Sequence, residues 1–171
     1  DNYEMSTQAF VKTLANFGCQ ASHDDVYEKL KESTDAAVKK FIPNQPQFLK
    51  AYKALEADYL KTPVLFTGAS EVLQAIVASG GRNFLVSHRN KQVLDILEKT
   101  KVLPYFTEVV TSESGFARKP NPESMLYLKE KYKIENALVI GDREIDKEAG
   151  QAAGFDTLLV DGKKSLLEIV K

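Results

Sequence analysis

Apolar residues recur at helical spacing through the first third of the chain. The first group is Phe10, Leu14 and Phe17, with spacings of four and three positions. It ends just before Gly18, and glycine is suited to a helix C-terminus. Ser22 and Thr34 are residue types that favour helix starts, so they predict a second and a third helix. A loop with two prolines at 42–47 then precedes a helix marked by Phe48, Tyr52, Leu55 and Tyr59. Residues before about 60 are therefore predicted to be entirely helical, with the aromatic side chains in their core.

The pattern changes after residue 61, where short strand-like segments alternate with amphipathic helices. The segment 137–140, Ala-Leu-Val-Ile, is an unbroken apolar run, as expected of a parallel strand buried on both faces. Further strands are predicted at 83–86, 108–111 and 157–160. This alternation predicts an α/β fold with a doubly wound, Rossmann-like parallel sheet. The chain is thus expected to comprise a small helical domain over 1–61 and an α/β core domain over 62–171.

Composition and charge restrict the classes of function. Of the 171 residues, 43% are hydrophobic and 27% are charged, which is the balance of a folded globular protein. The net charge of −1 gives no electrostatic case for a nucleic acid or an anionic membrane as partner. The single cysteine, Cys19, can form no intrachain disulfide, and no apolar run is long enough to span a membrane. We therefore expect a cytoplasmic protein, a monomer or a homodimer, with no nucleic-acid or membrane partner.

Polar side chains follow three of the predicted strands. Ser87 and His88 come directly after the first strand, and Lys119 lies in the loop after the second. Asp142 follows the strand 137–140 almost at once, and Asp146 lies four residues later on the first turn of the next helix. These loops share one edge of a doubly wound sheet, where such sheets bind ligands. Two carboxylates suit a hard cation such as Mg²⁺, and a hydroxyl, a lysine and a metal together stabilise a transferring phosphoryl group.

Each of these residues also has a structural explanation that the sequence leaves open. Acidic residues near a helix start cap the helix and interact favourably with its dipole, which would account for Asp142 and Asp146. Ser87 could equally be a helix N-cap, and Lys119 a solvated loop charge. His88 is expected to serve the backbone or a cap, in preference to binding metal or acting as a general base.

A family resemblance rests on three motifs and their order. S-H-R-N, R-K-P-N-P and G-D-R-E-I-D-K-E-A-G resemble motifs II, III and IV of the haloacid dehalogenase superfamily, and the helices before residue 60 resemble the small α-helical cap of its subfamily I. The resemblance implies that Ser87 and the backbone N–H of His88 bind phosphoryl oxygens and that Lys119 neutralises developing charge. It implies further that Asp142 binds Mg²⁺ directly, while Asp146 is an additional or water-mediated metal contact or orients Lys119.

Motif I, which in that superfamily supplies the attacking aspartate, is absent from the 171 residues. In the family it lies just upstream of the cap, so we expect it before Asp1, and we expect the segment shown to be an incomplete and inactive form of a longer protein. The strand that carries it is the central one in the family's sheet, between the strands of Ser87 and Asp142. A gap is therefore predicted there, with unpaired backbone groups on both sides.

The function implied by the resemblance is a magnesium-dependent phosphatase of the phosphoglycolate-phosphatase type. It would hydrolyse a small phosphorylated metabolite, a phosphomonoester, through an aspartyl-phosphate intermediate. One alternative is a 2-haloacid dehalogenase, against which the paired Asp142 and Asp146 argue because they would repel a carboxylate substrate without a cation. Another is a non-catalytic family member that keeps the fold as a binding or regulatory protein. A nicotinamide site is not favoured, because no G-x-G-x-x-G follows a strand.

Overall fold

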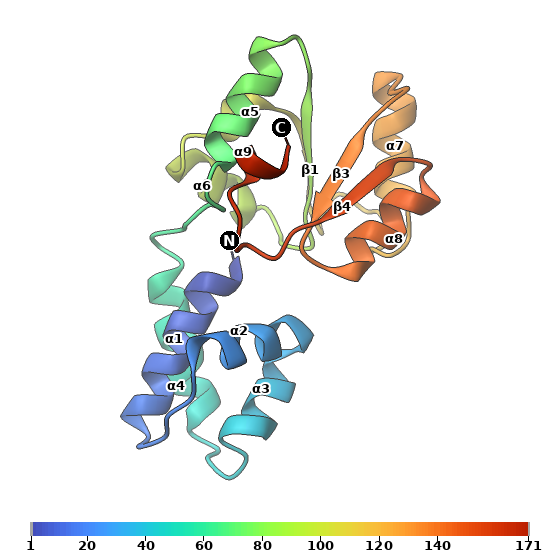
Figure 1. The fold of residues 1–171 in the computed structure, drawn as a ribbon. Helices are drawn as coiled ribbons and strands as arrows, with labels where there is room; N and C mark the ends of the chain where they lie inside the picture. The colour runs from blue at the N-terminus through green and yellow to red at the C-terminus, as the bar shows by residue number, and fades with distance from the viewer. Residues whose placement is uncertain (1, 171) are drawn as a thin grey trace. The chain divides into compact units, whose positions relative to one another are not determined.

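The computed structural model describes residues 2–170, which form two compact units. The first unit extends to Leu65 and the second begins at Phe66 (Figure 1). The boundary expected from the sequence lay four residues earlier, between 61 and 62. None of the helices in residues 2–170 has the length and apolar character needed to cross a membrane.

The first unit is built from helices, namely α1 (Asn2–Asn16), α2 (His23–Glu32), α3 (Thr34–Phe41) and α4 (Phe48–Tyr59). Serine caps fix two of the helix starts. The hydroxyl of Ser22 accepts the backbone N–H of Asp25 at 3.2 Å, and that of Ser33 accepts the N–H of Ala36 at 2.9 Å. Each cap satisfies an N–H group that has no partner inside the helix. The predicted start at Ser22 is confirmed, whereas α3 is capped by the residue before Thr34.

Aromatic side chains fill the core of this unit, as the sequence predicted. Phe10 is fully buried and packs edge-on against Phe48 and Tyr52, with ring centroids 4.9 and 5.0 Å away. Edge-on contact is a favoured geometry for aromatic pairs, and such rings contribute much of the apolar area that a small core can bury. Aromatic contacts thus join α1 to α4, and Val26, Leu30 and Ala37 bring side chains of α2 and α3 into the same core.

The second unit alternates strands and helices. Its strands are β1 (Asn83–Val86), β2 (Phe106–Val110), β3 (Leu138–Gly141) and β4 (Asp156–Leu159). The helices are α5 (Ala69–Ala78), α6 (Gln92–Lys99), the short 3₁₀ helix η1 (Leu103–Tyr105), α7 (Glu123–Tyr132), α8 (Glu144–Ala152) and α9 (Leu166–Ile169). Each predicted strand is present, with its bounds shifted by at most two residues.

The strands form two parallel pairs. β1 pairs with β2, where Phe84 lies opposite Glu108, and β3 pairs with β4, where Val139 lies opposite Thr157. Within the part of the chain that the structure describes, no pairing joins β1 to β3. The Rossmann-like core is thus present as two halves, and the gap predicted between the strand before Ser87 and the strand before Asp142 is observed.

Helix α8 packs closely on the β3–β4 pair, with α7 nearby (Figure 1). Gly150 makes this approach possible, because a Cβ atom there would lie 2.6 Å from Cγ2 of Thr157 and 3.0 Å from Cγ2 of Val139. Ala149 and Ala153 are buried on the same helix. Small side chains on this face bring the first turn of α8, which carries Asp146, against the end of β3.

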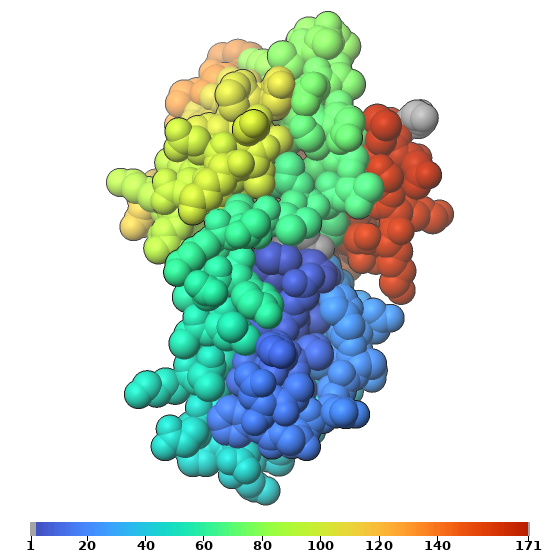
Figure 2. All heavy atoms as spheres, turned by 90° about the vertical axis from the view of Figure 1, so that its left-hand side faces the viewer, coloured from blue at the N-terminus to red at the C-terminus, as the bar shows by residue number. Residues whose placement is uncertain are grey.

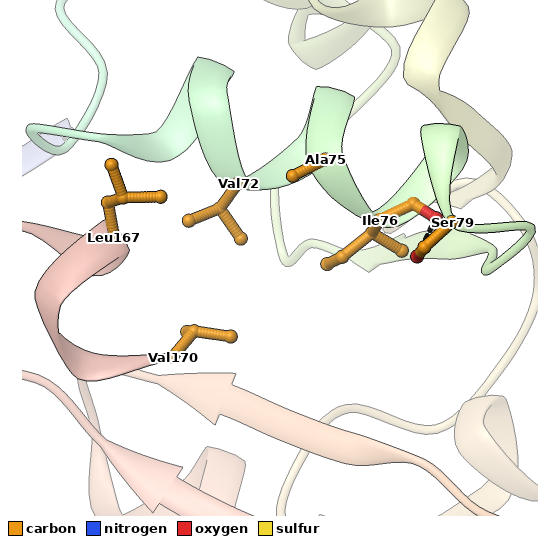
Figure 3. A pocket seen from close by; sticks show the side chains of 6 residues that line it. All are labelled: Val72, Ala75, Ile76, Ser79, Leu167 and Val170. Atoms are coloured by element: carbon orange, nitrogen blue, oxygen red, sulfur yellow. Dashed lines mark hydrogen bonds between the residues drawn. The ribbon is translucent and has the colours of Figure 1, made fainter.

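Helix α9 lies against α5, and Figure 2 shows the C-terminal segment (red) beside the α5 region (green). The backbone N–H of Leu166 donates to the carbonyl of Thr67 at 2.8 Å, which ties the two helix starts together. A pocket of about 270 Å³ lies between the helices (Figure 3), lined by Val72, Ala75, Ile76, Ser79, Leu167 and Val170. Its lining is mostly apolar and includes none of the predicted site residues.

Candidate active site

Ser87 lies directly after β1, at the carboxyl end of the strand. Its backbone N–H donates to the carbonyl of Val110 at 2.9 Å, which continues the contact with β2 beyond the last residue of β1. Its hydroxyl oxygen accepts the backbone N–H of Arg89 at 3.1 Å, a local turn that fixes the start of the loop. The hydroxyl is therefore held at the sheet edge that the sequence predicted.

Lys119 reaches the same edge from the loop before α7. Its ammonium nitrogen donates to the carbonyl of Val86, the last residue of β1, at 3.0 Å. It also donates to Oδ1 of Asp146 at 2.5 Å, and only 12% of the Lys119 side chain is exposed. Because the Lys119 side chain is mostly buried, it is not a solvated loop charge. Its ammonium lies beside Val86, the residue before Ser87.

Asp146 uses both of its carboxylate oxygens. Oδ1 accepts from Lys119, and Oδ2 accepts the backbone N–H of Arg143 at the N-cap position of α8 at 3.2 Å. The second contact satisfies a helix-terminal N–H, and a negative charge in the first turn also interacts favourably with the helix dipole. Of the alternatives left open by the sequence, this geometry supports helix capping and the orientation of Lys119.

His88 contacts the backbone of Lys119. Its Nε2 accepts the N–H of that residue at 3.0 Å, so this nitrogen is unprotonated and the proton of the neutral ring is on Nδ1. Burial lowers the pKa of His88, and the positive charges of Lys119, Arg118 and Arg143 lower it further, against a smaller opposing effect of Asp146. The ring is therefore neutral near pH 7 and serves the backbone.

Asp142 follows Gly141 at the carboxyl end of β3 and is partly buried. Among residues 2–170, no group of three His, Cys, Asp or Glu side chains is placed to hold a metal ion. Both oxygens of Asp146 accept hydrogen bonds from protein groups, and Asp142 is the second carboxylate at this edge of the sheet. Mg²⁺ is commonly bound through one or two protein carboxylates and keeps several waters, so one aspartate at this edge fits part of such a coordination sphere.

Sequence reasoning missed two features of this site. Arg118 and Arg143 act on His88 as positive charges, and neither was singled out as a candidate. Gly141, which directly follows the apolar run 137–140, was given no role, yet a Cβ atom there would lie 2.3 Å from Cβ of Asp146. A glycine between a buried strand and an aspartate is the signal that could have indicated this close approach.

Comparison with known proteins gives the family. A family model described as haloacid dehalogenase-like hydrolase matches residues 1–160. The chain belongs to this family. The membership that the three motifs predicted is therefore confirmed.

Curated relatives of this hydrolase-family chain include several named phosphoglycolate phosphatase. The protein of that name from Aquifex aeolicus is 29% identical over 163 residues, covering 88% of this chain and 74% of the relative. The one from Nitrosospira multiformis is 31% identical over 125 residues, covering 69% of this chain and 55% of the relative. The chain therefore spans between about half and three quarters of the length of these two relatives.

Solved structures of hydrolases share its fold. The crystal structure of a hydrolase from Streptococcus pneumoniae is 60% identical with a TM-score of 0.90, covering 99% of this chain and 89% of that one. A hydrolase of the same superfamily from Deinococcus radiodurans, crystallised with phosphate and sodium, is 21% identical with a TM-score of 0.81 and covers 95% of this chain and 77% of that one. The second likeness shows the fold alone, and both agree with the predicted Rossmann-like core.

Proposed function

We propose that this protein is a magnesium-dependent phosphatase that hydrolyses a small phosphomonoester, with phosphoglycolate as the first substrate to test. The observation that carries the proposal is the place of Lys119, whose buried ammonium lies 3.0 Å from the carbonyl at the end of β1. A lysine ammonium held at the end of the strand that Ser87 follows is suited to stabilise charge on a transferring phosphoryl group. The curated relatives named phosphoglycolate phosphatase support the substrate class.

In this mechanism the hydroxyl of Ser87 and the backbone N–H of His88 donate hydrogen bonds to phosphoryl oxygens. Lys119 neutralises the charge that develops on them, and Asp146 holds Lys119 in place. Asp142 would hold Mg²⁺, which supplies further charge neutralisation to the phosphoryl group when bound. The positive charges of Arg118 and Arg143 favour a substrate with several negative charges, such as a phosphate ester that also carries a carboxylate.

The attacking carboxylate is assigned to an aspartate on a strand between β1 and β3, outside the 171 residues. The facing edges of these strands have no partner in residues 2–170, which is consistent with a strand between them. Attack on phosphorus would form an aspartyl-phosphate and release the alcohol, and water would then hydrolyse the intermediate to regenerate the carboxylate.

The test compares the full-length wild-type protein with its Asp142→Asn variant. Phosphoglycolate and an aryl phosphate are assayed after chelation of metals and again during a titration with Mg²⁺. We expect hydrolysis only with the metal, and a loss of about 100-fold or more in kcat/KM in the variant. Asp95→Asn, a change at an exposed aspartate on α6, is the matched control and should behave as wild type.

Three outcomes would overturn the proposal. Activity of Asp142→Asn equal to that of wild type removes Asp142 from the metal site. A folded wild-type protein that releases halide from a 2-haloacid without metal, and no phosphate from either ester, is a dehalogenase. Absence of both activities, with Mg²⁺-independent retention of phosphoglycolate in a binding assay, identifies a binding protein.

A further inference from the structure

The side chain of His88 joins two loops of the second unit that are 31 positions apart in the sequence. His88 lies in the loop after β1, and Lys119 lies in the loop before α7. The Nε2 atom of the ring accepts the backbone N–H of Lys119 at 3.0 Å in a partly buried contact. The ring therefore holds the main chain of the same residue whose ammonium reaches Val86 and Asp146.

We propose that His88 is a positioning residue for Lys119, holding the Lys119 loop against the end of β1 through this one hydrogen bond. The inference rests on the proposed function, because Lys119 contributes to the reaction only if a phosphoryl group is transferred here. In this role the imidazole touches no substrate. It fixes the point from which the Lys119 side chain extends, and a displacement of about 1 Å in such a group can cost on the order of 100-fold in rate.

The contact requires a neutral ring. A protonated imidazole would present an N–H to the N–H of Lys119 and lose the hydrogen bond. It would also add a positive charge beside Lys119, Arg118 and Arg143, with Asp146 as the opposing negative charge. Burial and these cations lower the pKa of His88, which keeps the accepting form in place at neutral pH.

Glutamine and asparagine provide a matched pair of variants. The amide of His88→Gln places an acceptor oxygen near the position of Nε2, whereas the shorter amide of His88→Asn reaches only the position of Nδ1. The two variants share chemistry and charge and differ by one methylene group, so a purely structural effect of removing the ring would affect both. His88→Leu removes the acceptor altogether.

The variants are assayed in the full-length protein with phosphoglycolate and Mg²⁺. We expect His88→Leu and His88→Asn to lose about 10- to 100-fold in kcat with a smaller change in KM, and His88→Gln to recover about tenfold of that loss. The wild type should lose activity as pH falls through the lowered pKa of His88, and the Gln variant should lack this loss. In a Lys119→Ala background, His88→Leu should have no further effect on kcat, because His88 acts only by positioning Lys119.

A measurement without substrate separates this inference from the proposed function. Nitrogen-15 NMR of the wild-type imidazole should show the Nδ1–H tautomer with Nε2 accepting a hydrogen bond. A protonated Nε2 overturns the inference even in an active phosphatase. Equal kcat values for the Gln and Asn variants also overturn it. A kcat of His88→Leu within twofold of the wild-type value does so as well. A protein with the expected tautomer but no hydrolysis of any phosphomonoester overturns the proposed function and leaves the ring contact established.

Discussion

The ammonium of Lys119 lies 2.5 Å from Oδ1 of Asp146, and only 12% and 10% of the two side chains are exposed. Two charges this far removed from water depend on each other, because either one alone would be buried without compensation. The other oxygen of Asp146 accepts the N–H of Arg143 at the start of α8. One carboxylate thus fixes both the first turn of a helix and the direction of a lysine.

Removal of the Asp146 carboxylate should destabilise the fold. We expect Asp146→Ala to lower the free energy of unfolding by about 3 kcal/mol, since it leaves the Lys119 ammonium buried and unpaired. Glu144→Ala is the control on the same helix, because it breaks the ion pair between Glu144 and Lys147. The side chains of these two residues are 58% and 39% exposed, respectively. That variant should change stability by less than about 1 kcal/mol. Chemical denaturation measures both, and equal losses would contradict a special role for the buried pair.

Lys119 should matter for turnover more than for binding. Lys119→Ala is expected to cost about 2–4 kcal/mol of transition-state stabilisation, as deletion of other preorganised charge contacts does. Steady-state kinetics of the full-length protein with phosphoglycolate gives this value from kcat/KM, and kcat should fall by a larger factor than KM rises. Lys147→Ala removes an exposed lysine from α8 and serves as the comparison. A loss within twofold in the Lys119 variant would show that its ammonium does not act on the substrate.

Much of this core could be predicted from the sequence because its signals are local. Unbroken apolar runs locate strands such as Leu138–Gly141 to within one or two residues, and the order of the motifs predicted which strand ends carry polar groups. The absence of a pairing between β1 and β3 within residues 2–170 followed from the missing motif I. These features depend on residue type and spacing, which the sequence contains directly.

The contacts within the site depended on loop conformation, which the sequence does not contain. Asp146 was assigned either to the metal or to Lys119, and only the direction of its two oxygens distinguishes these roles. His88 was expected to serve the backbone, yet its partner, the N–H of Lys119, lies on another loop. Long-range contacts between a side chain and a main-chain group leave no periodic signal, so pattern analysis cannot find them.

Gly141 should be intolerant of any side chain. An added Cβ atom would lie 2.3 Å from Cβ and 2.6 Å from Oδ2 of Asp146, so Gly141→Ala must displace that carboxylate. We expect a loss of about 1–3 kcal/mol in unfolding free energy. We also expect a loss of phosphatase activity, because a displaced Asp146 would no longer hold the Lys119 ammonium in place. Gly115→Ala is the control: nothing lies near its Cβ position, and only its positive φ of 86° opposes the change. Gly115→Ala should lower the free energy of unfolding by about 1 kcal/mol and leave activity intact. Equal activity losses in Gly115→Ala and Gly141→Ala would refute the inference that a side chain at Gly141 displaces Asp146.

Glu108 on β2 should contribute to stability in a pH-dependent way. Its carboxylate accepts hydrogen bonds from Tyr127, Lys131 and Tyr132 of α7, at 2.9, 2.8 and 2.5 Å. Burial alone would raise the pKa of Glu108, but these three donors outweigh it and lower the pKa below its ordinary value of 4.5. A carboxylate with a lowered pKa in the folded state stabilises the protein above the unfolded-state pKa, and this contribution is lost as pH falls through the lowered value.

Glu108→Gln keeps an acceptor oxygen but removes the charge, so it isolates the electrostatic part of this contact. We expect it to lower the free energy of unfolding by about 1 kcal/mol at pH 7, as for a hydrogen-bonded charge near the surface. The difference from wild type should shrink as pH falls from 4.5 through the lowered pKa of Glu108, because both proteins are neutral at this position below that pKa. Glu130→Gln changes an exposed glutamate on α7 and controls for the loss of a negative charge. Denaturation curves between pH 3 and pH 7 decide the matter, since a difference that does not vary with pH would mean that the charge of Glu108 does not tie β2 to α7.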